Sequence, residues 1–203
     1  MELEKTAIIL LDYRNNQAVS QGLIRDDFDE TSDVTGVLEN IVALLKDLRN
    51  ALIISTPIIF TEEYRELDEP VGLLNTIADM GAFKMRENKD GTRSSMKRFG
   101  DSIIEIPSQQ SLNAFVHTDL EKILKKHAIE DVLLAGTACS ICLDWMGQFA
   151  VEKGFKVTMI SDCISGRTFL EQEFYFNRMY PLNATVMDSK SVLKNLHLER
   201  VTI

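Results

Sequence analysis

Short apolar runs rich in β-branched residues alternate with longer segments of helical period along this chain. The runs are Thr6–Leu11, Leu52–Phe60, Ile103–Ile106, Asp131–Gly136, Lys156–Ile160 and Ala184–Met187. Several are apolar almost throughout, which is typical of parallel strands buried on both faces. Strands that alternate with helices favour βαβ units with right-handed crossovers. The sequence therefore predicts an α/β fold, a three-layer αβα sandwich around a doubly wound, mostly parallel, Rossmann-like sheet.

The segments between the runs carry apolar residues at helical spacing. One stripe consists of Val34, Val37, Leu38, Ile41, Leu44, Leu45 and Leu48. Another consists of Cys142, Trp145, Met146, Phe149 and Ala150. Thr118-Asp119-Leu120-Glu121 and Thr168-Phe169-Leu170-Glu171 have the spacing of a capping box, in which each side chain satisfies the other residue's backbone N–H. We expect a helix to begin at each of these tetrapeptides.

Composition and charge exclude several classes of protein. The 203 residues suit a single domain over 1–203, with a long loop or arm at about 61–101. A net charge of −9 disfavours binding to nucleic acid and to anionic membranes. No apolar run approaches the roughly 20 residues of a membrane-spanning helix, and the N-terminus lacks the pattern of a signal peptide. Three cysteines, an odd number, do not indicate a disulfide framework, so a cytoplasmic location is expected.

Reactive side chains follow two of the predicted strands. Ligands of open α/β sheets bind beyond the carboxyl ends of the strands. Asp12 ends the first run, and Cys142 lies in the first turn of a helix that follows the fourth. A helix N-terminus favours a thiolate, and its N–H groups can stabilise an oxyanion. Asp12 and Cys142 are therefore a candidate base and nucleophile, although an isolated Cys on an apolar stripe is more often a small core residue.

The residues around this pair resemble the isochorismatase-like cysteine hydrolases, which include nicotinamidases and carbamoylsarcosine amidases. Asp12-Tyr13-Arg14-Asn15 matches their D-x-Q-N-type motif, with Arg14 in place of Gln. Gly136–Leu143 matches their G-x-x-(T/S)-x-x-C-V motif, and Ala150–Gly154 matches the A-x-x-x-G that follows. Ser161-Asp162, at the end of the next strand, is also family-like. The resemblance covers residues from about 5 to about 187.

The resemblance implies a role for each matching position. Cys142 would be the nucleophile, Asp12 the general base, and the backbone N–H groups of Ala138 and Cys142 the oxyanion donors. Arg14, Asn113 and Phe115 would contact the substrate, a small molecule with an amide-type C–N bond. The resemblance also implies a homo-oligomer, a dimer or tetramer. The aromatic segment Phe169–Tyr180 and the arm Thr61–Asp101 are candidates for its contact surfaces.

The chain departs from the family at the catalytic lysine. The alignment places Gln109 at that position, and no Lys or Arg lies between Gly100 and Lys122. Without that positive charge, a Cys142 thiolate and the Asp12 carboxylate would raise each other's pKa. Arg14 is a candidate replacement because it follows Asp12 by two residues in an extended chain.

Cofactors and metals are not expected. The metal-binding members use an Asp and histidines after the second strand, whereas Thr61-Glu62-Glu63-Tyr64-Arg65 contains no histidine. His117, His127 and His197 are scattered without the spacing of metal ligands.

Three functional hypotheses remain open from the sequence. The leading one is a hydrolase that forms a Cys142 acyl-enzyme, with Asp12 as the base. The second is an impaired family member, motivated by Gln109, that binds a small molecule or a protein without turnover. The third is a redox dithiol at Cys139-x-x-Cys142.

Overall fold

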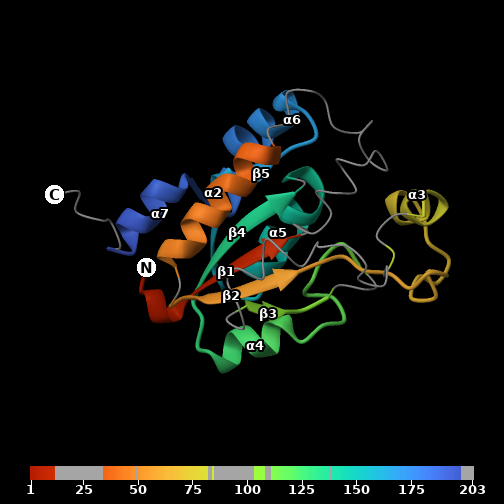
Figure 1. Cartoon of the computed structure of the whole chain (residues 1–203), viewed down its shortest axis with the longest axis horizontal. Coiled ribbons are helices and arrows are strands. Elements are labelled where there is room, and N and C mark those ends of the chain that lie inside the picture. Colours follow the sequence, from red (N-terminus) through yellow and green to blue (C-terminus); the bar gives the residue numbers. More distant parts are fainter. Residues whose placement is uncertain are drawn as a thin grey trace.

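The computed structural model describes residues 1–11, 34–48, 50–81, 84, 103–107, 111–137 and 139–197 of the chain. Its centre is a sheet of six parallel strands in the order β3-β2-β1-β4-β5-β6. The strands are β1 (Thr6–Leu11), β2 (Leu52–Thr56), β3 (Ile103–Glu105), β4 (Asp131–Thr137), β5 (Lys156–Ser165) and β6 (Thr185–Met187). The predicted α/β fold with a doubly wound parallel sheet is confirmed (Figure 1).

Helices connect the strands and cover both faces of the sheet. The α-helices are α2 (Val34–Asp47), α3 (Leu73–Asp79), α4 (Leu120–Lys126), α5 (Asp144–Glu152), α6 (Phe169–Phe174) and α7 (Ser189–Asn195). The shorter helical turns are η1 (Leu3–Lys5), η5 (Cys139–Leu143), η6 (Tyr175–Met179) and η7 (Tyr180–Leu182). Turns η5 and η6 are π-helical, and each adjoins an α-helix.

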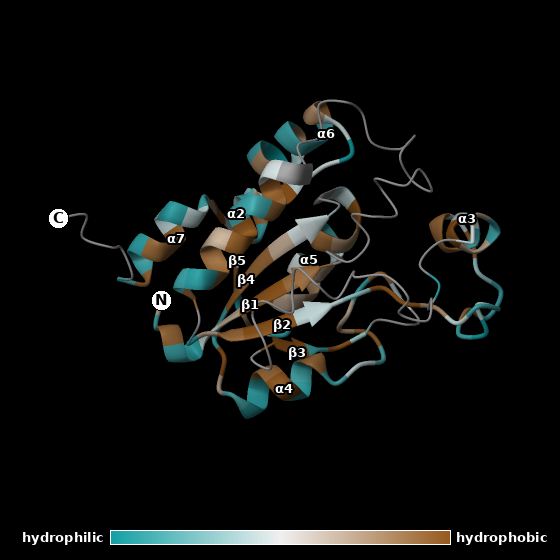
Figure 2. Ribbon diagram, viewed as in Figure 1, coloured by the Kyte–Doolittle hydropathy of each residue, from teal (hydrophilic) through white to brown (hydrophobic). Residues whose placement is uncertain are grey.

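The core consists of two buried clusters, one on each face of the sheet. Side chains of β1 alternate between them, because successive residues of a strand point to opposite faces. Ile8 and Leu10 pack with residues of α2 and α7, whereas Ile9 and Leu11 pack with residues of α4 and α5. Figure 2 shows the resulting hydrophobic colouring along the central strands and the mixed colouring of the helices. Both faces of β1 and β4 are thus buried, as the apolar runs predicted.

Two strands end elsewhere than the sequence predicted. The second run was expected to continue to Phe60, but β2 ends at Thr56. Pro57 follows it and has no N–H to donate to a neighbouring strand. The fifth strand, expected to end near Ile160, runs on to Ser165.

A break in register allows the longer β5. Leu134 pairs with Met159, but Gly136 pairs with Ile164, so β5 contains extra residues at this point. One of them, Asp162, accepts hydrogen bonds from the backbone N–H of Ser189 at 2.8 Å and from its hydroxyl at 2.6 Å. Ser161-Asp162, which looks like the end of a strand in the sequence, therefore lies inside β5. Its Asp162 carboxylate binds the first residue of α7.

The predicted irregular arm at about 61–101 contains helix α3. Ile77 is buried with Phe60 and Tyr64, and the Tyr64 hydroxyl donates to the Ile77 carbonyl oxygen at 3.2 Å. Figure 1 shows α3 set apart from the sheet, beyond the end of β2. The short apolar period of residues 73–79 was the signal for this helix.

The two predicted capping boxes differ in the structure. At α6, the Thr168 Oγ1 accepts from the Glu171 N–H at 3.0 Å, which is one half of the expected box, but the Glu171 carboxylate accepts from the Arg167 N–H and not from that of Thr168. At α4, the Thr118 hydroxyl instead donates to the Ala114 carbonyl oxygen and accepts from the Leu120 N–H at 3.1 Å. Helix α4 therefore begins without the predicted reciprocal cap.

The apolar stripe of α5 is only partly buried. Met146 and Ala150 are fully buried, whereas Trp145 is 48% exposed and Phe149 is 38% exposed. Each exposed residue precedes a buried one, and one residue turns an α-helix by about 100°.

No helix in the described residues is long and apolar enough to span a membrane.

Candidate active site

The candidate site lies where the order of strands reverses. The chain builds outward from β1 through β2 to β3 and then returns to place β4 on the other side of β1. Ligands of such sheets bind in the crevice outside the carboxyl ends of the strands at this switch point. In the register of β1 and β4, Leu11 pairs with Gly136. The two strand ends that precede Asp12 and the cysteine turn are therefore direct neighbours.

Gly136 permits the close approach of these two strand ends. Its φ is +147°, in the region that favours glycine. A Cβ at this position would lie 2.3 Å from the carbonyl oxygen of Leu11. Backbone geometry and lack of space therefore explain why the cysteine motif has glycine at position 136, without any role for Gly136 in a reaction.

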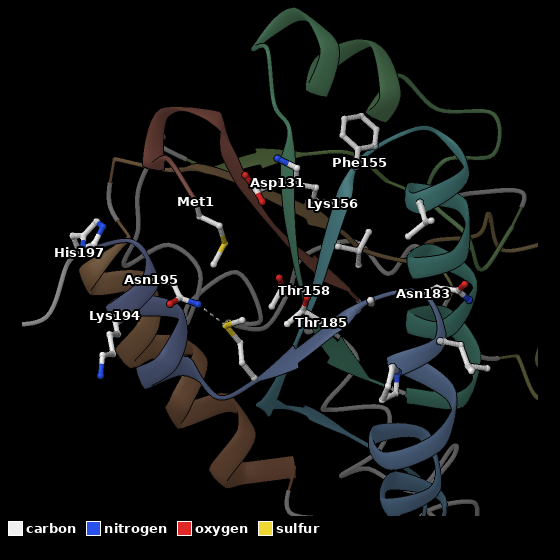
Figure 3. Close-up of a pocket in the computed structure, with 16 residues that line it drawn as sticks. Met1, Asp131, Phe155, Lys156, Thr158, Asn183, Thr185, Lys194, Asn195 and His197 are labelled. Atoms are coloured by element: carbon white, nitrogen blue, oxygen red, sulfur yellow. Dashed lines mark hydrogen bonds between the residues drawn. The ribbon is translucent and has the colours of Figure 1, made fainter.

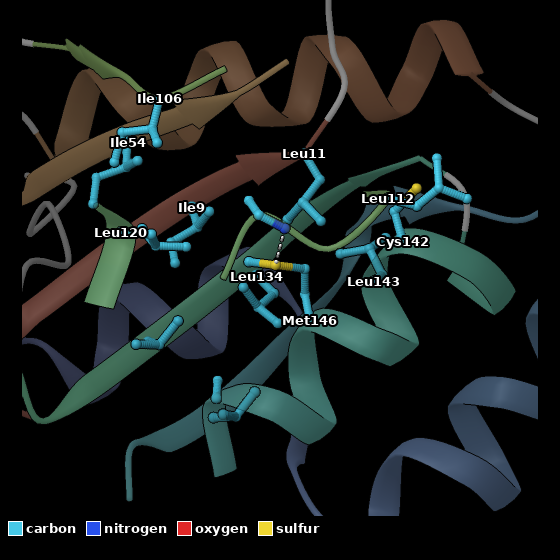
Figure 4. Packing of buried hydrophobic residues seen from close by; sticks show 14 of the residues in the cluster. Ile9, Leu11, Ile54, Ile106, Leu112, Leu120, Leu134, Cys142, Leu143 and Met146 are labelled. Atoms are coloured by element: carbon cyan, nitrogen blue, oxygen red, sulfur yellow. Dashed lines mark hydrogen bonds between the residues drawn. The ribbon is translucent and has the colours of Figure 1, made fainter. Parts of the chain in front are cut away.

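Cys142 lies in the π-helical turn η5, between the end of β4 and the start of α5. Its side chain is 6% exposed and belongs to a buried cluster with Leu112, Leu143 and Met146 (Figure 4). Single π-helical turns are rare in proteins, and those that occur are often found at functional sites. The sulfur therefore lies at the carboxyl end of β4, in surroundings that are largely closed to water.

The segment 111–118 packs against the cysteine helix. The backbone N–H of Ala114 donates to the Sδ of Met146 at 3.2 Å (Figure 4). Asn113 is buried, and its Oδ1 accepts from the backbone N–H of Phe115 at 3.0 Å. The ring of Phe115 stacks on Phe155, with 6.3 Å between the ring centroids. Asn113 is therefore close to the cysteine helix, while the ring of Phe115 faces the residue that precedes β5.

A polar cluster connects η5 to α6. The hydroxyl of Ser140 donates to Oε1 of Glu171, and the backbone N–H of Arg167 donates to Oε2 of the same carboxylate at 2.7 Å. The Arg167 guanidinium also donates to Oε1, at 2.9 Å from Nη2. Burial opposes ionisation of Glu171, but the hydrogen bonds from Ser140 and Arg167 outweigh it and hold the pKa of the carboxyl below its usual range.

Sequence reasoning missed this cluster. Glu171 was assigned only to a helix cap, and Ser140 was an unassigned position of the cysteine motif. The two residues are 31 positions apart, and no local pattern links them.

One further ionisable group, Asp144, adjoins the cysteine turn, and the thiol of Cys163 lies in the buried cluster on the other face of the sheet. Asp144, in the first turn of α5, has its pKa raised by burial, against a hydrogen bond from Gln148. Cys163 is fully buried in β5. Burial raises the pKa of its thiol, and the adjacent Asp162 carboxylate raises it further. Cys163 is thus chemically unlike a cysteine prepared to react.

Comparison with known proteins decides the family. The model of the isochorismatase domain matches residues 6–191. The chain belongs to the isochorismatase family. The resemblance drawn from the sequence motifs is thereby confirmed.

Among curated relatives, isochorismatase domain-containing protein 1 of Salmo salar is 26% identical over 149 residues, which is 73% of this chain and 44% of that protein. The chain spans about half the length of the first curated relatives it matches.

Several solved structures share this fold. A cysteine hydrolase from Pseudomonas syringae pv. phaseolicola has a TM-score of 0.77 at 13% identity, covering 97% of this chain and 94% of that one. N-carbamoylsarcosine amidase from Thermoplasma acidophilum has a TM-score of 0.64 at 17% identity, covering 91% and 96%. The YcaC gene product of Escherichia coli, described as an octameric hydrolase of unknown specificity, has a TM-score of 0.67 at 16% identity, covering 98% and 82%.

Several of the predicted site residues lie outside the described part of the chain. They are Asp12, Arg14, Gln109 and Ala138. Their roles remain predictions, as do those of Asn113 and Phe115. The described residues contain no group of three or more His, Cys, Asp or Glu side chains arranged to hold a metal ion.

A cavity of about 1120 Å³ lies elsewhere on this isochorismatase-family fold. It is lined by Asp131 and Lys156, the first residues of β4 and β5, and by Phe155, Thr185 and His197 (Figure 3). These positions mark the amino ends of the strands, opposite to the edge that carries Cys142. Active sites of parallel α/β sheets lie at the carboxyl ends, so this cavity is not the candidate active site.

Proposed function

We propose that this chain is a cysteine-dependent hydrolase that cleaves an amide-type C–N bond of a small molecule. The observation that carries the proposal is the position of Cys142. Its turn follows β4 at the switch point of the sheet, and Leu11, which precedes Asp12, pairs with Gly136 of β4. Because these two strand ends are neighbours, we expect the nucleophile and the base that follow them to lie within reach of one another.

In the proposed reaction, Asp12 accepts the proton of the Cys142 thiol as the sulfur attacks the carbonyl carbon. The N–H groups of Ala138 and Cys142 donate to the oxyanion of the tetrahedral intermediate. The C–N bond then breaks, and the leaving nitrogen takes the proton from Asp12. Water, losing a proton to Asp12, attacks the thioester; the acid is released and the thiol regains its proton.

Two findings support a hydrolase of this kind. Cys142 lies in a π-helical turn that leads directly into α5, and the first N–H groups of a helix have no partner within that helix. The structural relatives include a cysteine hydrolase and N-carbamoylsarcosine amidase, an enzyme named for a C–N substrate.

Selective alkylation tests the nucleophile. We expect iodoacetamide to label Cys142 faster than Cys163 in the folded protein, as measured by peptide mass spectrometry over time. A panel of amides and ureas is then compared between the wild-type chain and Cys142→Ala. Equal labelling of the two cysteines, or turnover that survives in Cys142→Ala, would refute the proposed mechanism.

A second candidate is a binding module without turnover, and Gln109 is the observation that favours it. Gln109 can donate a hydrogen bond but brings no charge to stabilise a thiolate. Gln109→Lys restores the family's cation and is assayed on the same panel. Activity that appears only in Gln109→Lys supports the binding module, whereas clear wild-type activity that Cys142→Ala abolishes supports the enzyme.

We further propose that the chain assembles into a homo-oligomer in the cytoplasm. Among described residues, the large apolar side chains that are most exposed fall in two regions. One is α3 with its flanks, which carries Val71, Leu73 and Met80. The other is the surface of α5, α6 and η7, which carries Trp145, Phe149, Phe169, Leu170, Phe174 and Leu182. Exposed apolar side chains in such numbers mark contact surfaces, and both regions overlap those expected from the sequence.

A further inference from the structure

The main-chain turn that carries Cys142 is held from outside by one side of the α6–η6 segment. Ser140 occupies the second position of η5. Its hydroxyl donates to the Glu171 carboxylate, and its carbonyl oxygen accepts from the Tyr175 hydroxyl at 3.5 Å. Glu171 and Tyr175 are four residues apart and thus lie on the same face of the helix. The hydroxyl and the carbonyl oxygen of Ser140 are therefore both bound by a segment that is distant in sequence.

Glu171 is itself fixed in place. Its side chain is 13% exposed and accepts from the backbone N–H and the guanidinium of Arg167. Its own backbone N–H donates to the Thr168 Oγ1. A capping box would direct this carboxylate to the N–H of Thr168. Here the carboxylate reaches the N–H of the residue before, and also crosses to Ser140, so more than a helix cap is needed to explain its orientation.

We propose that Glu171 is a positioning residue of the active site, acting through Ser140 on the turn that presents Cys142. The inference rests on the proposed function, in which the Cys142 sulfur and the N–H groups of Ala138 and Cys142 converge on one carbonyl group. A displacement of about 1 Å in such a constellation costs about 100-fold in rate. The link from Glu171 to Ser140 opposes that displacement at the residue two positions before the nucleophile.

The direction in which Glu171→Gln changes the pKa of the Cys142 thiol distinguishes a positioning role from a direct effect of charge. Glu171→Gln removes a negative charge near the cysteine and leaves Arg167 positive, so electrostatics alone would lower the pKa of the Cys142 thiol. Loss of positioning moves the thiol away from the N–H groups that favour its thiolate and would raise the pKa. Asp144, in the first turn of α5, is unchanged in this variant, and so is Asp12, the base of the proposed reaction.

The experiment measures the rate of Cys142 alkylation by iodoacetamide as a function of pH. We expect the midpoint to rise by about 0.5 to 1 pH unit in Glu171→Gln, which lowers the rate at neutral pH about three- to tenfold. Ser140→Ala removes the link without changing any charge and should give the same shift. The double variant should shift no further than either single one, because both break one connection.

Two control variants and the wild-type reference complete the test. Glu173→Gln removes a carboxylate of the same helix that bonds to Asn177 and not to η5, and should leave the midpoint unchanged. Ser140→Thr keeps the hydroxyl and should restore the wild-type midpoint. An unchanged or lowered midpoint in Glu171→Gln, or wild-type behaviour of Ser140→Ala, overturns the positioning role alone. Equal labelling of Cys142 and Cys163 in the wild-type chain overturns the proposed function and this inference together.

Discussion

The carbonyl oxygen of Leu11 occupies the space that a side chain on Gly136 would need. The two residues pair across β1 and β4, and a Cβ on residue 136 would lie 2.3 Å from that oxygen. Backbone atoms, unlike the end of a flexible side chain, cannot move aside without separating the strands. The spacing of the two central strand ends, and hence of the residues that follow them, depends on this contact.

Gly136→Ala should lower the free energy of unfolding by about 2 to 4 kcal/mol, through strain at positive φ together with the backbone clash. Urea denaturation measures the loss. Gly154→Ala is the matched control, because Gly154 also has positive φ (+91°) but has no atom within 4 Å of its Cβ position. We expect a loss of about 1 kcal/mol there. Equal losses would show that the contact with Leu11 contributes nothing.

Removing apolar side chains from the contact surfaces should weaken self-association. Leu170 is 79% exposed on α6 and Val71 is 81% exposed before α3. Leu170→Ser and Val71→Ser are compared by sedimentation velocity over a range of concentrations, with Lys190→Ser as a surface control. A monomeric wild-type chain would contradict the proposed oligomer, and a shift in only one variant would identify the surface used.

The Glu121 carboxylate should stabilise the folded state at neutral pH and lose this effect in acid. Its carboxylate binds Lys125 on the same helix and, at 2.8 Å, Lys153 at the end of α5. These hydrogen bonds hold the pKa of Glu121 at about 2 rather than 4.5. Because the pKa is lowered by folding, the stabilisation is complete above pH 4.5 and is lost as the pH falls toward 2.

The comparison for Glu121 is the difference in unfolding free energy between the wild-type chain and Glu121→Gln. Urea titrations should give a small difference at pH 7 that shrinks at pH 3 and is reduced by salt, since these groups are on the surface. A difference that grows toward low pH would contradict the assignment.

Cys163 should resist alkylation until the chain unfolds. Burial and the neighbouring Asp162 raise the pKa of its thiol, and the thiolate is the reactive form. In native protein at pH 9, we expect peptide mass spectrometry to find Cys163 almost unmodified, and to find it fully modified in urea. Rapid labelling of the native thiol would show that β5 opens readily.

The fold was accessible from the sequence wherever burial alone determined it. The runs at β1 and β4 are apolar on both faces, and the structure confirms their bounds within one residue. Strand ends were harder to place, because they depend on partners: Asp162 lies inside β5, at a break in register with β4, and its carboxylate binds Ser189. The exposure of Trp145 was also missed, since a periodic stripe does not reveal how wide a face the protein covers.

The candidate site also contains features that the sequence could predict and features that it could not. The position of Cys142 follows from a local motif, so the sequence was sufficient to place it at the end of β4. The connection from Ser140 to Glu171 joins segments 31 residues apart, and only the packing of α6 against η5 brings them together. The roles of Asp12 and Gln109 in the proposed turnover remain sequence predictions.

The strand order has a consequence for how this chain emerges from the ribosome. β1 lies between β2 and β4, and the residues that pair with its second edge are 131–136. That edge cannot be covered until more than half of the chain has been synthesised, so an apolar strand with unpaired N–H and C=O groups is exposed meanwhile. The β1–β3 part of the nascent chain therefore exposes an unpaired strand edge before the cysteine turn has been made.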